Sequence, residues 1–366
     1  MSACKWAVGP ALAGLMALAS LPGSAAEATT DPRALAEQAQ QLVEQGQPEQ
    51  AEPLYRRAAT LLEEALGPDH QQVIEALRGL AESYGLQGRP DEAEPLQKRI
   101  VASREKTLGA ENSALVPDLE QLGLIYLQLG RTADAEPVFR RVLAVQEKTL
   151  GPDNPALAEA VRAVASVLSE QQRLADAVPL YERAVELREK GADQDAPKLA
   201  DSLDDLARAY GRQHRYPAAE ALYKRALAVR EAALGPSHFN VSVSLINIGA
   251  LYLETQRPAE VAPLFARAIA IREKGPKLAV PLTLYKLAEL YRTHRHSDAA
   301  EPLYQRALTG FEQQVGAEHP YVVNVLNGLA ANADAAGRAA DAERYRNQTA
   351  VILQKSHDGG RQSPSR

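Results

Sequence analysis

Apolar residues recur along this chain three and four positions apart, and the pattern itself returns about every 42 residues. One copy of this stripe is Leu203, Leu206 and Tyr210. The spacing i, i+3 and i+7 follows one face of an α-helix and cannot lie along one face of a β-strand. Equivalent stripes stand at Leu77–Leu80–Tyr84, Leu119–Leu122–Tyr126 and Leu284–Leu287–Tyr291. The pattern predicts an all-α chain built from repeated helices.

A second phrase, Ala-Glu-Pro-Leu-Tyr in its fullest form, marks another helix in each copy. The copies of this motif begin at Ala51, Ala93, Ala135, Ala177, Ala219, Val261, Ala300 and, in a degenerate copy, Ala342. Successive copies are 42 residues apart, except for a step of 39 between Val261 and Ala300. The three missing residues fall around Lys274–Lys277, where a loop can shorten without disturbing packing. The proline falls in or just after the first turn, where its missing N–H costs little.

Short polar segments separate these helices. A turn such as Gln87–Asp91 divides the two helices of a repeat, and Leu-Gly-Pro, as at Leu234, follows the second helix. Glycine just past a helix end followed by proline is a stop signal. A small residue within the first stripe, such as Gly249, would let the two helices touch. The predicted repeats are 32–73, 74–115, 116–157, 158–199, 200–241, 242–280, 281–322 and 323–355.

These residues resemble the tetratricopeptide repeat, whose pattern is a large apolar residue, then Leu, Gly/Ala and Tyr, and later Ala, Phe/Tyr and Ala. The resemblance covers residues 32–355, and the 42-residue period with Leu-Gly-Pro-x-His connectors is most similar to the kinesin light chain class. HEAT and armadillo repeats have a similar period but lack the Gly/Ala and Tyr spacing. The resemblance implies a right-handed α-α superhelical solenoid of about eight helix pairs.

The two ends differ from the interior repeats. Gln38 in the first repeat, and Ala333 and Arg346 in the last, replace large apolar residues. A polar outer face is expected on terminal repeats, because no neighbour stacks there. Residues 356–366 have no periodicity and are predicted to form a disordered tail.

The first 26 residues are unlike the rest. Lys5 precedes the uncharged apolar stretch Trp6–Leu21, and the small residues Ser24–Ala26 follow it. This order is typical of a cleaved signal peptide. The alternative is a membrane anchor, but 16 residues interrupted by Gly9 and Pro10 are marginal for spanning a bilayer. We therefore predict that residues 1–26 are a signal peptide and that the chain is exported, to the periplasm or out of the cell. The composition, rich in Ala and Arg, indicates a bacterium, and we expect a Gram-negative one.

Composition narrows the function classes. Apolar residues make up 45% and charged residues 24%, which excludes a disordered chain and a multi-span membrane protein. Removal of residues 1–26 takes away Cys4 and Lys5 and changes the net charge from −6 to −7. Without cysteine the exported chain has no disulfides. The acidic balance argues against nucleic acid as a partner, and no membrane insertion is expected after signal cleavage.

Motifs of catalysis are missing from the sequence. It has no Gly-rich phosphate loop after a strand, no Gly-x-Ser-x-Gly and no His-Glu-x-x-His. His294 and His296 form a His-x-His, but a zinc site needs further placed ligands. We predict no catalytic residue, no metal site and no cofactor. An enzyme therefore ranks as a hypothesis behind the two binding and structural functions given below. Asn240 and Asn347 match glycosylation acceptors that matter only in a eukaryotic secretory pathway.

The resemblance also implies a binding surface, because the first helix of each repeat lines the concave side. Groove positions of the fifth repeat include Asp201 and Asp204. The predicted partner-binding groove is Asp205, Arg208, Val243, Ile246, Asn247, Leu282, Tyr285, Lys286 and Glu289. Asn247 stands where kinesin light chain-like repeats place an asparagine that bonds the backbone of a bound peptide. In most other repeats the equivalent position is not asparagine; it is occupied by Gly79, Gln121, Ala163, Asp205, Lys286 and Gly328.

Four of these residues, Val243, Ile246, Leu282 and Tyr285, are apolar where a solvated face would be polar. An apolar patch with a charged rim is typical of a peptide groove. The alternative is that Val243 and Ile246 pack against the adjacent repeat.

Two functions follow from these patterns. The first is a scaffold or adaptor of the cell envelope that binds a partner peptide or helix in its concave groove. The alternative is a structural subunit that assembles through its convex face or ends, as an oligomer or within an envelope complex. The location of surface apolar residues distinguishes the two, and the sequence does not identify the partner.

Overall fold

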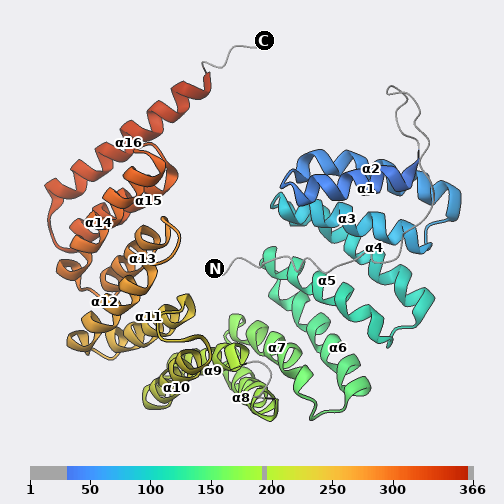
Figure 1. Ribbon diagram of the computed structural model, residues 1–366, viewed down its shortest axis with the longest axis horizontal. Helices are drawn as coiled ribbons and strands as arrows, with labels where there is room; N and C mark the ends of the chain where they lie inside the picture. The colour runs from blue at the N-terminus through green and yellow to red at the C-terminus, as the bar shows by residue number, and fades with distance from the viewer. Residues whose placement is uncertain (1–30, 192–195, 362–366) are drawn as a thin grey trace. The chain divides into compact units, whose positions relative to one another are not determined.

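The computed structural model of the protein describes residues 31–191 and 196–361 (Figure 1). For residues 356–361 it describes the helical backbone alone. The predicted signal peptide lies outside the described residues. Within these ranges every regular element is a helix. The α-helices are α1 Pro32–Glu44, α2 Pro48–Leu66, α3 Gln71–Leu86, α4 Pro90–Leu108, α5 Val116–Gln128, α6 Thr132–Leu150, α7 Ala158–Glu170, α8 Leu174–Lys190, α9 Ala196–Arg212, α10 Tyr216–Leu234, α11 Phe239–Glu254, α12 Val261–Arg272, α13 Ala279–Thr293, α14 Ser297–Val315, α15 Pro320–Ala335 and α16 Ala339–Arg361. Short 3-10 turns at Ser113–Leu115, Pro155–Leu157 and Pro258–Glu260 lead into α5, α7 and α12.

Each odd-numbered helix pairs with the helix that follows it, so the prediction of an all-α chain of eight helix pairs is confirmed. We number these pairs as repeats 1 to 8. Several first helices begin a few residues before the predicted repeat boundary, for example α11 at Phe239 rather than 242. At the other end α16 continues to Arg361, six residues past the predicted boundary at 355, and includes Gly359 and Gly360.

The connectors between repeats have a defined cap structure. Gly235 ends α10 with φ +84°, a conformation that residues with a Cβ rarely adopt. His238 then caps α11, because its Nδ1 accepts a hydrogen bond from the backbone N–H of Asn240 at 3.2 Å. The same capping role falls to His70, Asn112, Asn154 and His319. The recurring His or Asn of the connectors is therefore a helix cap.

The described residues form two compact halves that divide between Leu187 and Arg188. In the C-terminal half one apolar core extends from Ala207 to Tyr345. Its first helices α9, α11, α13 and α15 each contact the next one, whereas consecutive second helices make less contact. Stacked pairs that approach more closely on one side curve toward it. The first helices therefore form the inner layer of this half, as the resemblance to the tetratricopeptide repeat implied.

The glutamate of the recurring Ala-Glu-Pro-Leu-Tyr phrase links consecutive repeats. Glu220 on α10 accepts hydrogen bonds from Arg257 at 2.7 Å and from the Tyr252 hydroxyl at 2.9 Å, both from repeat 6. Equivalent ion pairs join Arg89 to Glu52, Arg131 to Glu94, Arg173 to Glu136 and Arg338 to Glu301. These pairs fix how one second helix sits beside the next.

This linkage predicts a pH-dependent effect of replacing Glu220 by glutamine. Hydrogen bonds from Arg257 and Lys224 lower the pKa of Glu220 to about 2. Because the folded-state pKa lies below the unfolded value, the stabilisation is present at neutral pH and is lost as pH falls toward 2. Thermal melts should show Glu220→Gln less stable than the wild type at pH 7, with a difference that shrinks below pH 5. Glu273→Gln, at an exposed carboxylate without an ion pair to a described residue, is the control. A difference that stays constant with pH would contradict the assignment.

Candidate functional site

The residues predicted for the groove lie on α9, α11 and α13, three successive helices of the inner layer. Asp205 and Arg208 come from α9; Val243, Ile246 and Asn247 from α11; Leu282, Tyr285, Lys286 and Glu289 from α13. The four apolar residues of the predicted groove thus sit on two neighbouring helices, Val243 and Ile246 on α11 and Leu282 and Tyr285 on α13.

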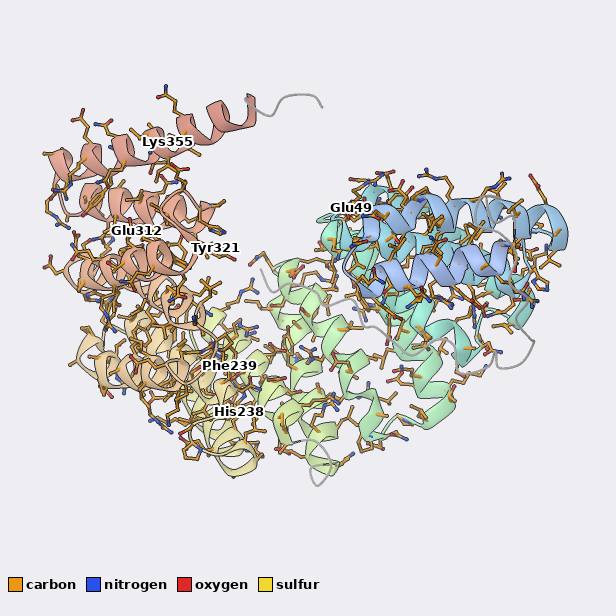
Figure 2. The ribbon with its side chains drawn as sticks, turned by 45° about the horizontal axis from the view of Figure 1, so that its top comes forward. Glu49, His238, Phe239, Glu312, Tyr321 and Lys355 are labelled. Carbon is orange, nitrogen blue, oxygen red and sulfur yellow. The ribbon has the colours of Figure 1, made fainter. Side chains whose placement is uncertain are left out.

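A cavity of about 350 Å³ lies between α11 and α13 and ends at the last residue of α12. Four predicted residues line it, namely Val243, Ile246, Leu282 and Lys286. Two further lining residues, Phe239 and Arg272, were missed by sequence reasoning. Figure 2 labels Phe239, which follows His238 at the start of α11. The shortened connection between repeats 6 and 7 supplies Pro276 and Leu278 to the same cavity. We call this cavity the α11–α13 pocket.

The apolar residues of this pocket differ in exposure. Leu282 is 41% exposed, whereas Val243 is half-buried. Ile246 is only 3% exposed and belongs to the apolar core, so the expectation that it forms part of an exposed patch is wrong. Its position faces the interface between helix pairs, which removes it from solvent. The alternative of packing against the adjacent repeat holds for Ile246, which forms an inner wall of the pocket.

Beside the pocket, Asn247 is half-buried, and its side chain makes no hydrogen bond to a described residue. Tyr285 is also half-buried, with its ring 6.1 Å from that of Tyr304, and burial raises its pKa. Glu289 accepts hydrogen bonds from Arg292 at 2.6 Å and from the Tyr304 hydroxyl. Asn247 and Tyr285 are therefore suited to contact a ligand, whereas Glu289 already takes part in a contact between α13 and α14.

On α9, Asp205 forms an ion pair with the exposed Arg208 at 2.9 Å. Asp204, which was expected to face the groove, is only 4% exposed. It accepts a hydrogen bond from Arg230 of α10 at 2.7 Å, and burial raises its pKa to about 6. Asp204 is thus a structural residue of the helix interface, because a buried carboxylate requires a buried counterion.

The pocket carries positive charge. Burial lowers the pKa of Arg272 to about 10. Loss of hydration, and then repulsion by Arg272 and Arg208, lower the pKa of Lys286. No carboxylate among the described residues forms an ion pair with Arg272 or Lys286. Two cations thus border an apolar cavity, an arrangement that attracts an anionic group.

Among the described residues, no group of three or more His, Cys, Asp and Glu is placed to hold a metal ion. No helix within residues 31–191 or 196–361 has the length and apolar character needed to cross a membrane. The His294 Nδ1 lies 2.8 Å from the Leu290 carbonyl oxygen, and the His296 ring packs edge-on against Tyr291.

Comparison with known proteins supports the helix-pair assignment. The sequence model of the tetratricopeptide repeat matches residues 32–106, 115–190, 198–274 and 280–355, two helix pairs in each match. Among curated proteins, none matches this chain. A solved structure of nearly identical kinesin light chain TPR-like repeats from Podosopora anserina is 25% identical over 55% of this chain and 96% of its own, with a TM-score of 0.50.

Two further solved structures are similar in fold alone. The apo form of the quorum sensor NprR from B. thuringiensis has a TM-score of 0.58 at 14% identity, covering 88% of this chain and 87% of its own. Aspartyl phosphate phosphatase F from Bacillus subtilis has a TM-score of 0.52 at 12% identity, covering 91% and 96%.

Proposed function

Because the chain belongs to the tetratricopeptide repeat family, we propose that it is a protein-interaction scaffold that binds a partner's peptide or helix along α9, α11 and α13. The observation that carries this proposal is the α11–α13 pocket. It combines apolar walls, two cations without an internal counterion and, beside it, an unbonded Asn247 amide. Such a pocket supplies both the apolar anchor and the polar contacts that peptide recognition uses.

The proposed location is the cell envelope. Support comes from the sequence Lys5, Trp6–Leu21 and Ser24–Ala26, which follows the order of a signal peptide. A partner would then be another exported protein or the exported segment of a membrane protein.

The test is co-purification of partners from the envelope fraction with wild type and the double variant Asn247→Ala/Tyr285→Ala. Both side chains are half-buried, and Tyr285 packs at the edge of the core beside Tyr304, so we expect a variant that is folded but somewhat less stable and that loses partners retained by the wild type. The matched control is Gln313→Ala/Gln314→Ala on the exposed side of α14. Melting temperatures of all three proteins check folding. The same partners with the groove variant as with the wild type would contradict binding at this site.

One observation favours the alternative of assembly through an end or the convex face. A wider cavity of about 770 Å³ lies between α14, α15 and α16, with Val322, Leu326 and the 53% exposed Val351 among its lining residues. Glu312 and Lys355 lie at its border (Figure 2). This alternative predicts partner contacts at Val351 instead of Leu282, a difference that crosslinking can resolve.

A further inference from the structure

Repeat 5 contains a buried arginine with two internal counterions. Arg230, at the C-terminal part of α10, is only 3% exposed. It donates hydrogen bonds to Asp201 at 2.6 Å and to Asp204 at 2.7 Å, both on α9, and to Ser244 of α11 at 2.5 Å. The positive charge is thus neutralised by carboxylates of its own repeat.

Repeat 6 keeps the arginine but lacks the carboxylates. Arg272 stands 42 residues after Arg230, in the same register of the second helix. The positions equivalent to Asp201 and Asp204 are occupied by Val243 and Ile246. The pocket therefore opens where repeat 5 holds an ion pair, and Arg272 faces it without the carboxylate partners that Arg230 has.

The surroundings of Arg272 fix its orientation. Its Nε donates a hydrogen bond to the Ser242 hydroxyl at 2.6 Å, and its guanidinium lies over the Phe239 ring at 3.2 Å from the centroid. Its two Nη atoms make no hydrogen bond to a described residue. A guanidinium held by one edge and one face presents its other edge as a rigid fork, which fits a carboxylate.

The rest of the pocket completes a site for an acidic residue with an apolar neighbour. Lys286 lines the pocket from α13 and adds a second positive charge. Val243, Ile246 and Leu282 form apolar walls, and the volume of about 350 Å³ lies in the range of ligand sites. Because Arg272 is half-buried beside these walls, a charge-assisted hydrogen bond to it is stronger than it would be in bulk water.

We propose that the α11–α13 pocket binds an acidic side chain of the partner peptide, which takes the place of the missing Asp201 and Asp204 equivalents as the counterion of Arg272. The apolar residue next to it packs on Val243, Ile246 and Leu282. The acidic group is an internal Asp or Glu, because the inner layer continues on both sides of the pocket, from α9 to α15, so that a peptide passes through. This inference rests on the proposed function and specifies the chemistry of its ligand.

The test begins with selection of random peptides displayed on phage against the full chain. The wild type should enrich peptides in which Asp or Glu stands beside Leu, Ile, Val or Phe. An enriched peptide is then synthesised with blocked ends, so that its side chain is the only carboxylate, alongside its Gln analogue. We expect the Gln analogue to bind about tenfold more weakly or worse, as measured by fluorescence anisotropy.

Variants of the protein locate the effect. Arg272→Gln should bind the acidic peptide and its Gln analogue equally, whereas Arg267→Gln, on the exposed side of the same helix, should keep the wild-type preference. Val243→Asp restores the counterion found in repeat 5 and should weaken binding of the acidic peptide about tenfold or more while the protein stays folded.

The outcomes separate this inference from the proposed function. Peptides that are enriched without an acidic residue, or that bind Arg272→Gln as tightly as the wild type, would overturn the inference and leave a peptide-binding groove. A Gln analogue with a free C-terminal carboxylate that binds as well as the acidic peptide would also overturn it. If no peptide is enriched on the wild type, both the inference and the peptide-binding function are contradicted.

Discussion

Replacing Arg230 by alanine is expected to lower the free energy of unfolding of the C-terminal half by about 3–5 kcal/mol. Arg230 is 3% exposed, and its removal leaves Asp204 buried without a counterion. A buried carboxylate that loses its partner must keep its charge at a high desolvation cost or take up a proton. This is the largest single-site effect that the ion pairs of the structure predict.

The measurement is chemical denaturation of wild type and variant at pH 7, followed by circular dichroism. Arg272→Ala, 42 residues further on, is the matched control, because Arg272 has no carboxylate partner among the described residues; we expect a loss of about 1 kcal/mol or less there. The double variant Arg230→Met/Asp204→Leu removes both charges and should recover most of the lost stability. Equal losses at Arg230 and Arg272 would show that the two sites do not differ as described.

Replacing Gly249 by leucine is the second change with a large expected effect. A Cβ built on Gly249 would lie 2.3 Å from Cε1 of Phe265, so the side chain has no space between α11 and α12. Either the Phe265 ring must leave the core or the two helices must separate, at a cost of about 1–3 kcal/mol or more. The melting temperature of the variant should fall accordingly.

Two further variants make this test specific. Gly211→Ala is the matched control, because an added Cβ there meets nothing within 4 Å, and a stabilisation of about 0.4–1 kcal/mol is expected. Phe265→Leu combined with Gly249→Ala should be less destabilised than the sum of the two single variants. A Gly249→Leu protein with the same melting temperature as the wild type would contradict the close packing of α11 against α12 at this position.

The repeat pattern was sufficient to predict the helix pairs, because each copy repeats the same local signals for helix start, packing stripe and stop. The resemblance to the tetratricopeptide repeat also placed Val243, Leu282 and Lys286 on neighbouring helices of one layer. What it could not resolve is which side of a first helix is covered by the next pair. Ile246 and Asp204 occupy equivalent positions and are both buried, although one is apolar and the other charged.

Arg272 and Phe239 were missed for a related reason. Both lie at helix ends near a connector, where the periodic stripe carries no information. Arg272 could have been found by comparing equivalent positions of successive repeats and looking for a charged residue that is kept while its oppositely charged partners are replaced. Arg230 and Arg272 share a register, and the loss of Asp201 and Asp204 equivalents in repeat 6 is visible in the sequence once the ion pair is known.

The central claim is that a partner binds at the α11–α13 pocket, and site-specific photocrosslinking in the cells that produce the protein tests it most directly. A benzophenone amino acid is placed singly at Leu282 in the pocket, at exposed Ala270 on α12, and at Val351 on α16. We predict a crosslinked partner from position 282 that disappears in the Arg272→Gln background, and none from positions 270 or 351. Crosslinks from position 270 or 351, with none from position 282, would contradict the claim and support assembly through the convex face or the C-terminal end.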